Sequence, residues 1–560
     1  MLDRATVDSL FPSDLPETSE WEQRYPARAV DGFVTRFGPS PTGFVHIGGI
    51  YTAMVSRDLA HSTSGVYYLR IEDTDQAREV AGADVQFARA FDAFDLRPDE
   101  GPLSARSTGA GEGEDGPYGP YRQSERGTIY LSFVRDLLRK GLAYPDFATK
   151  EELAEISEAQ KKLKLPTGYY GRWAPWRDAD EGEVTRRLEA GDPYVVRFRS
   201  EGKVGERVAF TDRLRGRVEA EDNHNDVVIL KTSAALDTPG GLRLPTYHFA
   251  HAVDDHLMRT SLVVRGDEWL SSVPTHLQLF AALGFSQVDY AHLAPLMKQE
   301  GSSRRKLSKR KDDEASVDFY LEAGYPTEAV LYYLRGLANA ALAEVPLADA
   351  LATPLQLDLF QSAGPLVDMV KLGDICADHI ATLPADQVLA GVRGWAESYD
   401  SALVEVLDEN QQLALAAIDV ERVGVDNPRK DLARWSDFRT AYGFFFPALF
   451  DDVTDPADER FNGLDPALVA RLAADLAQRY THEGDQPTWF QQVRDLAERH
   501  GFAPNPKSYK KDPDAYPGML RDAANVIRVL VTGAQRSPDL YEVTRVLGAD
   551  EVARRIRAVA

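Results

Sequence analysis

Cysteine is almost absent from this chain of 560 residues, in which Cys376 is the single example. One thiol excludes an internal disulfide framework and any zinc site built from several cysteines. Chains without disulfides are typical of reducing compartments, so we expect a cytoplasmic protein. The first twenty residues are acidic and lack the apolar segment of a secretory signal, which agrees with that expectation.

Long apolar runs and a positive charge balance are absent as well. No stretch of eighteen or more apolar residues occurs, so we expect no membrane-spanning helix and no membrane partner. The formal net charge of −24, taken alone, disfavours a nucleic-acid partner. Two basic segments, "KKLK" at 161–164 and "RRKLSKRK" at 304–311, weaken that argument because a large acidic protein can carry a local basic surface. For 161–164 a solvated charged face explains the pattern equally well.

Apolar residues make up 43% of the chain, enough for the three or four domains that its length suggests. The first third alternates between patterns typical of strands and of helices. Ile47, Ile50 and Met54, for example, share one face of a predicted helix. Such alternation predicts a parallel α/β sheet. The predicted elements are strand 33–37, helix 44–60, strand 65–75 and helices 79–95 and 124–140.

Two segments interrupt this alternation. The segment 99–122, rich in glycine, serine and acidic residues, predicts a surface loop. The segment 141–225 mixes basic, aromatic and β-prone residues and predicts an inserted subdomain. We expect the α/β alternation to resume with strand 226–231, helix 245–258 and strand 261–270.

Beyond about residue 315 the patterns become helical, and the chain end is the clearest example. Ser537 is predicted as an N-cap with Pro538 in the first helical position, and Gly548 as the stop. The apolar faces of this helix and the next are predicted to comprise Leu540, Val543 and Leu547, then Val552, Ile556 and Val559.

The stretch "RFGPSPTGFVHIGGIYTAM" at 36–54 combines a rigid turn, glycines and a helix start. Glycines let a ligand approach the backbone, and the free amides of a helix N-terminus attract anions. His46 could donate a hydrogen bond to a phosphate there. Taken alone, the pattern fits an ordinary Pro-Gly turn equally well. A second segment, "KLSKR" at 306–310, carries lysines that could clamp triphosphate oxygens.

These segments carry a resemblance to a known family. "PSPTGFVHIGG" is similar to the HIGH motif and "KLSKR" to the KMSKS motif of class I aminoacyl-tRNA synthetases. Together with "YLRIEDTD", "YGPYRQSERGTIY" and "VVRGDEWLSSVPTH", in this order, they resemble the glutamyl-tRNA synthetase family from about residue 33 to 340. "VTGAQRSPDLYEVTRVLG", near the end, resembles the close of that family's anticodon-binding region.

The resemblance implies an α/β fold: a Rossmann-like parallel-sheet catalytic domain with an inserted α+β subdomain, followed by an all-α C-terminal half. The predicted boundaries are an N-terminal extension at 1–30, catalytic halves at 31–140 and 226–300, an acceptor-binding insertion at 141–225, a KMSKS-type loop and stem-contact region at 301–375, and an anticodon-binding region at 376–560.

The resemblance also implies a reaction, in which ATP activates L-glutamate to glutamyl-adenylate and the acyl group passes to tRNA. Mg²⁺ would accompany the ATP. The catalytic residues implied by the two motifs are His46, Gly48, Lys306, Ser308 and Lys309. The implied ATP-binding residues are Pro39, Gly43, His46, Gly48, Gly49 and Lys309. Gly49 departs from the motif, because its second histidine is absent.

The residues implied for glutamate binding are Arg36, Ser40, Glu72, Tyr247, His251 and Arg265. Glu72 suits the ammonium group, and the two arginines suit the carboxylates. An ion pair of Arg265 with Asp267 or Glu268 is the alternative explanation for that arginine. His251 stands where some relatives carry asparagine.

On the tRNA side, basic and aromatic residues alternate near the end of the chain. Lysine beside tyrosine suits phosphate contact with base stacking, although a lysine-rich surface loop fits equally well. The candidates are Lys507, Tyr509, Lys510 and Lys511. Many bacterial relatives hold zinc in the insertion through cysteines, but "YPDFAT" has none, so we expect no structural zinc.

We therefore expect a monomeric glutamate–tRNA ligase that binds tRNA(Glu), ATP and L-glutamate. A form that also glutamylates tRNA(Gln) stays open, and a catalytically silent RNA-binding relative is a weaker alternative. A glutamine enzyme fits two arginines and a carboxylate less well. The long helical half disfavours a short paralogue without an anticodon domain.

Overall fold

The computed structural model describes residues 2–41, 43, 45–75, 80, 82–102, 115–233 and 242–559. The chain divides into two compact units. Unit 1 comprises Met1–Phe319 and Leu331–Val367, and unit 2 comprises Tyr320–Val330 and Asp368–Ala560. Parts of the predicted loop 99–122 and of the predicted helix 79–95 lie outside the described residues. The finer domain boundaries given above stay predictions.

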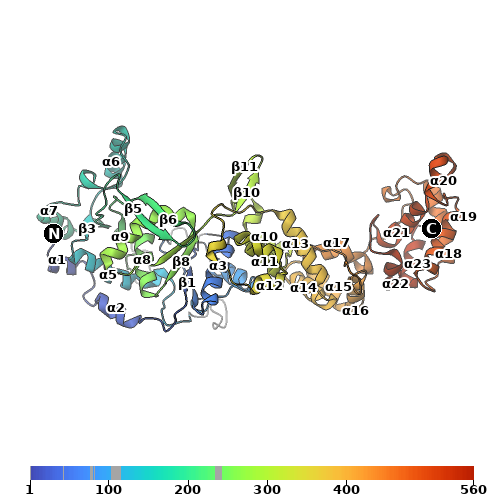
Figure 1. The fold of residues 1–560 in the computed structure, drawn as a ribbon, viewed down its shortest axis with the longest axis horizontal. Coiled ribbons are helices and arrows are strands. Elements are labelled where there is room, and N and C mark those ends of the chain that lie inside the picture. The colour runs from blue at the N-terminus through green and yellow to red at the C-terminus, as the bar shows by residue number, and fades with distance from the viewer. Residues whose placement is uncertain are drawn as a thin grey trace. The chain divides into compact units, whose positions relative to one another are not determined.

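Unit 1 is built around a six-stranded sheet in the order β2-β1-β8-β9-β5-β6 (Figure 1). Neighbouring strands from β2 to β5 run parallel, and only β6 is antiparallel to its neighbour. The strands are β1 (Val34–Phe37), β2 (Val66–Leu69), β5 (Arg207–Asp212), β6 (Gly216–Glu221), β8 (Leu262–Gly266) and β9 (Asp289–Leu293). The predicted Rossmann-like parallel sheet is thereby confirmed.

The first two strands of the sheet are buried rather than alternating. All four residues of β1 are buried, as are three of four in β2, although Thr35 and Arg36 of β1 are polar. The pairing Thr35↔Leu262 joins β1 to β8 across most of the unit's sequence. The helices of this part are α3 (Ile47–Ser62), α4 (Ala83–Ala93), α5 (Gly127–Arg139), α8 (Tyr247–Leu257) and α9 (Val273–Leu283).

A second, three-stranded antiparallel sheet lies within the insertion. Its strands are β3 (Ala143–Asp146), β4 (Val195–Phe198) and β7 (Val228–Leu230), and the helices nearby in sequence are α6 (Lys150–Lys162) and α7 (Glu181–Glu189). The strand predicted at 226–231 exists, but it pairs antiparallel with β4. The predicted return of the parallel pattern at this strand is therefore wrong. Conversely, the β5–β6 hairpin, from within the predicted insertion, extends the large sheet.

The N-terminal residues form two short helices, α1 (Arg4–Ser9) and α2 (Thr18–Arg24). Both contact α5, and Trp21 donates from its ring nitrogen to the hydroxyl of Ser132 on that helix, at 3.0 Å. The side chains of Trp21 and Tyr25 belong to the same buried core as α5, α8 and α9. The first thirty residues are thus part of the core of unit 1.

Every regular secondary-structure element among the described residues of unit 2 is a helix. Its helices after α10 (Val317–Ala323) and α11 (Thr327–Ala338), which both units share, are α13 (Met369–Thr382), α14 (Ala385–Tyr399), α15 (Ser401–Glu409), α16 (Gln411–Asp419), α17 (Phe438–Tyr442), α18 (Pro466–Arg479), α19 (Gln486–Arg499), α20 (Pro506–Lys511), α21 (Leu520–Thr532), α22 (Leu540–Leu547) and α23 (Ala549–Arg557). The remaining helix, α12 (Leu347–Ala352), lies in unit 1. The predicted all-α C-terminal half is confirmed.

The N-cap predicted near the chain end is wrong by two residues. Asp539, not Ser537, caps α22, accepting a hydrogen bond from the backbone of Glu542. Both residue types are good caps, but Pro538 lies outside the helix. Gly548 ends α22 as predicted, with a positive φ of 80°. No helix among the described residues is long and apolar enough to cross a bilayer.

Candidate active site

A cavity of about 590 Å³ lies beyond the carboxyl ends of β1, β2 and β8. We call it the arginine pocket. In open parallel sheets, ligands bind in the crevice beyond the carboxyl ends of the strands, which loops surround. Its lining residues are Arg36, Gly38, Ser40, Glu72, Thr74, Asp75, Lys231, Thr246, Tyr247, Arg265 and Trp269. Five of the six residues predicted for glutamate binding are among them.

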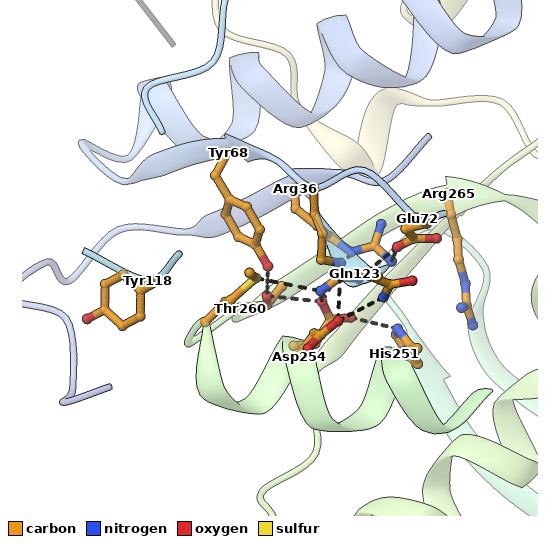
Figure 2. A network of polar contacts seen from close by, with 12 residues as sticks. Arg36, Tyr68, Glu72, Tyr118, Gln123, His251, Asp254, Thr260 and Arg265 are labelled. Carbon is orange, nitrogen blue, oxygen red and sulfur yellow. Dashed lines mark hydrogen bonds and ion pairs between the residues drawn. The ribbon is translucent and has the colours of Figure 1, made fainter. Parts of the chain in front are cut away.

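Glu72 is fixed in this pocket before any ligand arrives. Its Oε1 accepts a hydrogen bond from Nη2 of Arg70 at 2.8 Å, and its backbone N–H donates to the carbonyl of Pro39. The absence of a side chain at Gly38 leaves room for the carboxylate, since a Cβ there would lie 2.3 Å from Glu72 Oε1. The carboxylate is thus held within a narrow space at the pocket wall (Figure 2).

Arg36 belongs to a buried cluster of alternating charges around Arg70. Its Nε lies 3.4 Å from Asp255 Oδ1, the same oxygen that Arg70 Nη1 reaches at 2.6 Å. Burial opposes the charge of Arg36, but Asp255 and Glu72 outweigh it and raise the pKa of the guanidinium. Burial alone would raise the pKa of the Asp255 carboxyl. Arg70 and Arg36 outweigh burial and bring that pKa well below its usual value. Both groups are therefore ionised.

Arg265 is surrounded by neutral groups instead. Its Nε donates to Nε2 of His292 at 3.0 Å, and Nη2 lies 3.3 Å from Nδ1 of His276. The hydroxyl of Tyr247 lies 3.4 Å from Nη1. No carboxylate among the described residues lies within ion-pair distance of this guanidinium. Its charge is therefore available to an anionic ligand.

The alternative explanation of Arg265 by a local ion pair is wrong. Asp267 pairs with Arg215 at 2.8 Å, and Glu268 pairs with Lys306 at 3.4 Å. Both acidic residues have other basic partners, so their closeness to Arg265 in the sequence does not indicate an ion pair with it.

His251 lies behind the pocket wall rather than on its surface. It is fully buried, with Nε2 at 3.0 Å from the hydroxyl of Tyr290 and Nδ1 at 2.7 Å from Asp255. Burial lowers the pKa of His251 to about 3, against the opposing effect of Asp255, so the imidazole is neutral. Its ring stacks on that of Tyr247 at a centroid distance of 6.0 Å.

A second cavity, of about 270 Å³, lies at the start of α3 and is called the His46 pocket. Gly48, Gly49 and Gly266 line it, and the lack of side chains there lets a ligand approach the backbone; the first two are predicted for ATP binding. Its lining residues are His46, Gly48, Gly49, Tyr51, Thr52, Gly266, Glu268, Leu293, Ala294, Pro295, Leu296, Lys306 and Leu307. Gly43 has a φ of 137°, which explains a glycine in the preceding turn.

His46 is the N-cap of α3. Its Nδ1 accepts from the backbone N–H of Gly48 at 2.8 Å, so the ring proton resides on Nε2. Burial, followed by the charges of Lys309 and Lys306, lowers the pKa of His46 to about 4. At neutral pH the ring is therefore an uncharged hydrogen-bond donor.

The two predicted motifs meet in space although about 260 residues separate them. Val317 donates from its backbone to the carbonyl of Val45 at 3.0 Å, next to a bridge between His46 and Ser316. The lysines of "KLSKR" follow a hairpin of β10 (Met297–Glu300) and β11 (Ser303–Lys306). One wall of the His46 pocket thus comes from each motif.

Asp312 holds the lysine loop in shape. Its carboxylate accepts from Arg305 at 2.6 and 2.7 Å and from the backbone of Ser308 at 2.9 Å, and Lys298 lies 3.1 Å away. Arg305, with the other donors, lowers the pKa of Asp312 far below its usual value. Lys309 itself is exposed, and burial of part of its side chain lowers the pKa of its ammonium.

Several residues at the site were missed from the sequence. Trp269 lines the arginine pocket with its ring 4.3 Å from that of Tyr247, and its place just after β8 could have indicated it. Asp255 stands eight residues after Tyr247, on the same face of α8, a spacing that the sequence offers. Lys231, which follows β7, donates to the carbonyl of Thr74; no sequence signal points to it.

In unit 2 the predicted tRNA contacts lie on α20. Lys507, Lys510 and Lys511 are exposed, and Tyr509 is half-buried. A cavity of about 620 Å³ begins beside this helix, and its polar lining includes Asn505, Arg521, Asn525, Arg528 and Gln535. The exposed lysines and the basic cavity therefore occupy neighbouring parts of unit 2.

Comparison with known proteins identifies the family of this chain. Residues 33–372 match the family model described as "tRNA synthetases class I (E and Q), catalytic domain", and residues 519–560 match one described as "Anticodon binding domain". The chain therefore belongs to the class I aminoacyl-tRNA synthetases.

Full-length relatives narrow this assignment. The chain is 41% identical to the glutamate–tRNA ligase of Clostridium perfringens (strain 13 / Type A) over 554 residues, covering 98% of each chain. It is 38% identical to that of Acetivibrio thermocellus over 559 residues. The particular family is therefore that of the glutamate–tRNA ligases, and this enzyme is one of them.

Solved structures have the same fold. A glutamate tRNA ligase from Elizabethkingia meningosepticum, in complex with its amino acid, matches with a TM-score of 0.73 and 26% identity, covering 93% of this chain and 98% of that one. The synthetase of Elizabethkingia anophelis matches with a TM-score of 0.72 and 25% identity. The predicted family and fold are both confirmed.

Proposed function

We propose that the arginine pocket binds L-glutamate and that the His46 pocket binds ATP. The observation that carries this proposal is the contrast between Glu72 and Arg265 in one cavity. A fixed carboxylate suits the ammonium group of an amino acid, and an arginine with no acidic partner among the described residues suits a carboxylate. Arg36 serves the second carboxylate, and Ser40 and Tyr247 supply hydroxyl groups.

Activation then needs little covalent chemistry from the protein. An oxygen of the α-carboxylate attacks the α-phosphorus of ATP, and the bond from that phosphorus to the departing bridging oxygen breaks as pyrophosphate leaves. Neutral His46 donates from Nε2 to a phosphate oxygen, while Lys306 and Lys309 stabilise the charge that gathers on pyrophosphate. A terminal ribose hydroxyl of tRNA next attacks the mixed anhydride, and AMP leaves.

Lys306 makes a different contact in the structure. It pairs with Glu268, and both side chains are about half exposed. A pair so exposed contributes little, and triphosphate oxygens can replace the carboxylate at small cost. Ser308 serves the loop through its backbone bond to Asp312.

We expect Mg²⁺ to bind together with ATP. Among the described residues no group of three or more histidine, cysteine, aspartate or glutamate side chains is arranged to hold a metal ion. Mg²⁺ is commonly held by phosphates, waters and few protein groups, which fits these pockets. When bound, it screens the phosphate charges; the lysines of the loop share that task.

We assign tRNA binding to the insertion, at the acceptor end, and to unit 2, at the anticodon. The lysines of α20 and the neighbouring basic cavity support the second assignment, since phosphates and splayed bases call for these groups. We further propose that the enzyme acts as a cytoplasmic monomer. Charging of tRNA(Gln) as well as tRNA(Glu) stays open.

ATP–pyrophosphate exchange with glutamate and cognate tRNA tests the assignment of the two pockets. We expect Arg265→Gln to raise KM for glutamate and Lys306→Ala to raise KM for ATP. Crossed effects would contradict the assignment, and no exchange in the wild-type enzyme would favour a silent RNA-binding relative. Charging of purified tRNA(Glu) and tRNA(Gln) separates the two specificities.

A further inference from the structure

Three nitrogens of Arg265 are held, each by a different neutral partner. An arginine has five N–H groups, one on Nε and two on each terminal nitrogen. The contact with His292 uses the one on Nε. The contacts with Tyr247 and His276 leave one N–H on each terminal nitrogen. A carboxylate can therefore bind Arg265 in bidentate geometry only through the two terminal nitrogens.

The contact between His292 and Arg265 requires one particular form of the imidazole. Nε2 accepts from the guanidinium, so it carries no proton, and Nδ1 holds the proton and donates it to Asp212 Oδ2 at 2.6 Å. Burial lowers the pKa of His292, and the hydrogen bond to Asp212 opposes that effect without overcoming it. His292 is therefore a neutral bridge between an acidic and a basic side chain.

Asp212 is fixed by the hairpin that carries it. This last residue of β5 accepts from the backbone N–H groups of Leu214 and Arg215 in the β5–β6 turn, each at 2.9 Å. It also accepts from the backbone of His292 at 3.2 Å. Its side chain is almost fully buried, so it cannot be satisfied by water.

We propose that His292, oriented by Asp212, is a positioning residue that separates this carboxylate from Arg265 and keeps the guanidinium available to substrate. His292 lies between Arg265 and Asp212 and contacts both. A direct ion pair between them would turn the terminal nitrogens away from the cavity and cancel the charge that a glutamate carboxylate needs. This inference rests on the proposed binding of a glutamate carboxylate by Arg265.

Two substitutions of His292 separate its two contacts. Asn places its amide near the position of Nδ1, so His292→Asn keeps a donor to Asp212 and loses the acceptor for Arg265. Gln reaches the position of Nε2, so His292→Gln restores an acceptor for Arg265. Both are neutral, and both are measured by ATP–pyrophosphate exchange with the full-length enzyme and cognate tRNA.

We expect His292→Asn to raise KM for glutamate about 10-fold or more, which is the effect of losing a hydrogen bond to a charged group. KM for ATP and kcat should change less than about 3-fold, and His292→Gln should return KM for glutamate to within about 3-fold of wild type. Equal KM values for the Asn and Gln variants, or a parallel loss in all three constants, would overturn the proposal.

Arg265→Gln, measured alongside, distinguishes this inference from the proposed function. If it leaves KM for glutamate unchanged, the assignment of Arg265 to substrate fails, and the role of His292 with it. If it raises KM while His292→Asn does not, only the role of His292 fails. Should His292→Asn not fold, His292→Leu, which offers no acceptor, takes its place with the same expectation.

Discussion

Arg70 Nη2 lies 2.8 Å from Glu72 Oε1, and the guanidinium of Arg70 is completely buried. Arg70 directly follows β2, and Glu72 lies two residues further on, so a strand end and an ion pair together fix the carboxylate. A group held in place before binding loses little entropy when the substrate arrives. The contact therefore links the stability of unit 1 to the recognition of an ammonium group.

Gly38→Ala tests this preorganisation. The new Cβ would lie 2.3 Å from Glu72 Oε1, and the flexible end of that side chain would move to make room. We expect kcat/KM for glutamate to fall about 10²-fold, the effect of misplacing a binding group by an ångström, with the fold retained. Steady-state exchange kinetics measure it. Gly373→Ala, where nothing lies within 4 Å of the new Cβ, is the matched control; equal kinetics in both variants would contradict the idea.

Replacing Arg70 should instead destabilise unit 1. Arg70→Met leaves Asp255 and Glu72 with less compensation in a buried site, which costs about 3 to 5 kcal/mol of unfolding free energy. Hydrogen exchange of peptides from α8 measures the loss. Arg393→Met removes an arginine from an exposed pair with Glu397 and Asp408 and should change little. A small effect in both variants would show that the buried cluster is not needed for stability.

Lys309→Ala should slow activation. Removing one group that stabilises developing charge costs about 10² to 10³ in rate. We expect that loss in ATP–pyrophosphate exchange, with tRNA affinity within about twofold of wild type, because the phosphates of ATP and not of tRNA are its target. Lys311→Ala, two residues further on, is the control. A large loss of tRNA affinity would assign Lys309 to a different partner.

The partly buried, neutral His46 should make the fold sensitive to acid. The pKa of His46 is about 4 in the folded chain against an ordinary value of 6.5. The unfolded chain therefore binds more protons between these values, and stability is lost as pH falls from about 6.5 towards 4. Thermal unfolding between pH 7.5 and 5 measures the slope. His46→Gln should reduce it, and an unchanged slope would contradict the lowered pKa of His46.

Five of the six residues that the sequence suggests for glutamate binding line one cavity, and their role stays a prediction. Arg36 and Arg265 stand near the carboxyl ends of β1 and β8, and Glu72 follows β2; parallel strands bring such ends together. The motif resemblance supplies the rest of that set. What it does not supply are the partners that hold these residues, because Asp212 and His292 lie 80 residues apart and meet only through strand pairing.

Short apolar runs explain the errors in the fold. The run that contains β7 is correctly predicted to be a strand. Its residues do not indicate whether it pairs with β4 or with a strand of the parallel sheet. At the chain end, Ser537 and Asp539 are both suitable caps, and Pro538 between them fits a helix start equally well. In both cases tertiary packing decides between local alternatives of similar free energy.

The pairing of β1 with β8 has a consequence for synthesis of the enzyme. Val34 donates from its backbone to the hydroxyl of Ser261, a partner 227 residues away in the chain. At translation rates of 5 to 20 residues per second, β1 waits roughly 10 to 45 s for that partner. Throughout this interval a strand that is fully buried in the folded protein has one edge uncovered, which is the kind of surface that chaperones bind. The same connection that assembles the pocket from distant segments therefore exposes the growing polypeptide to aggregation.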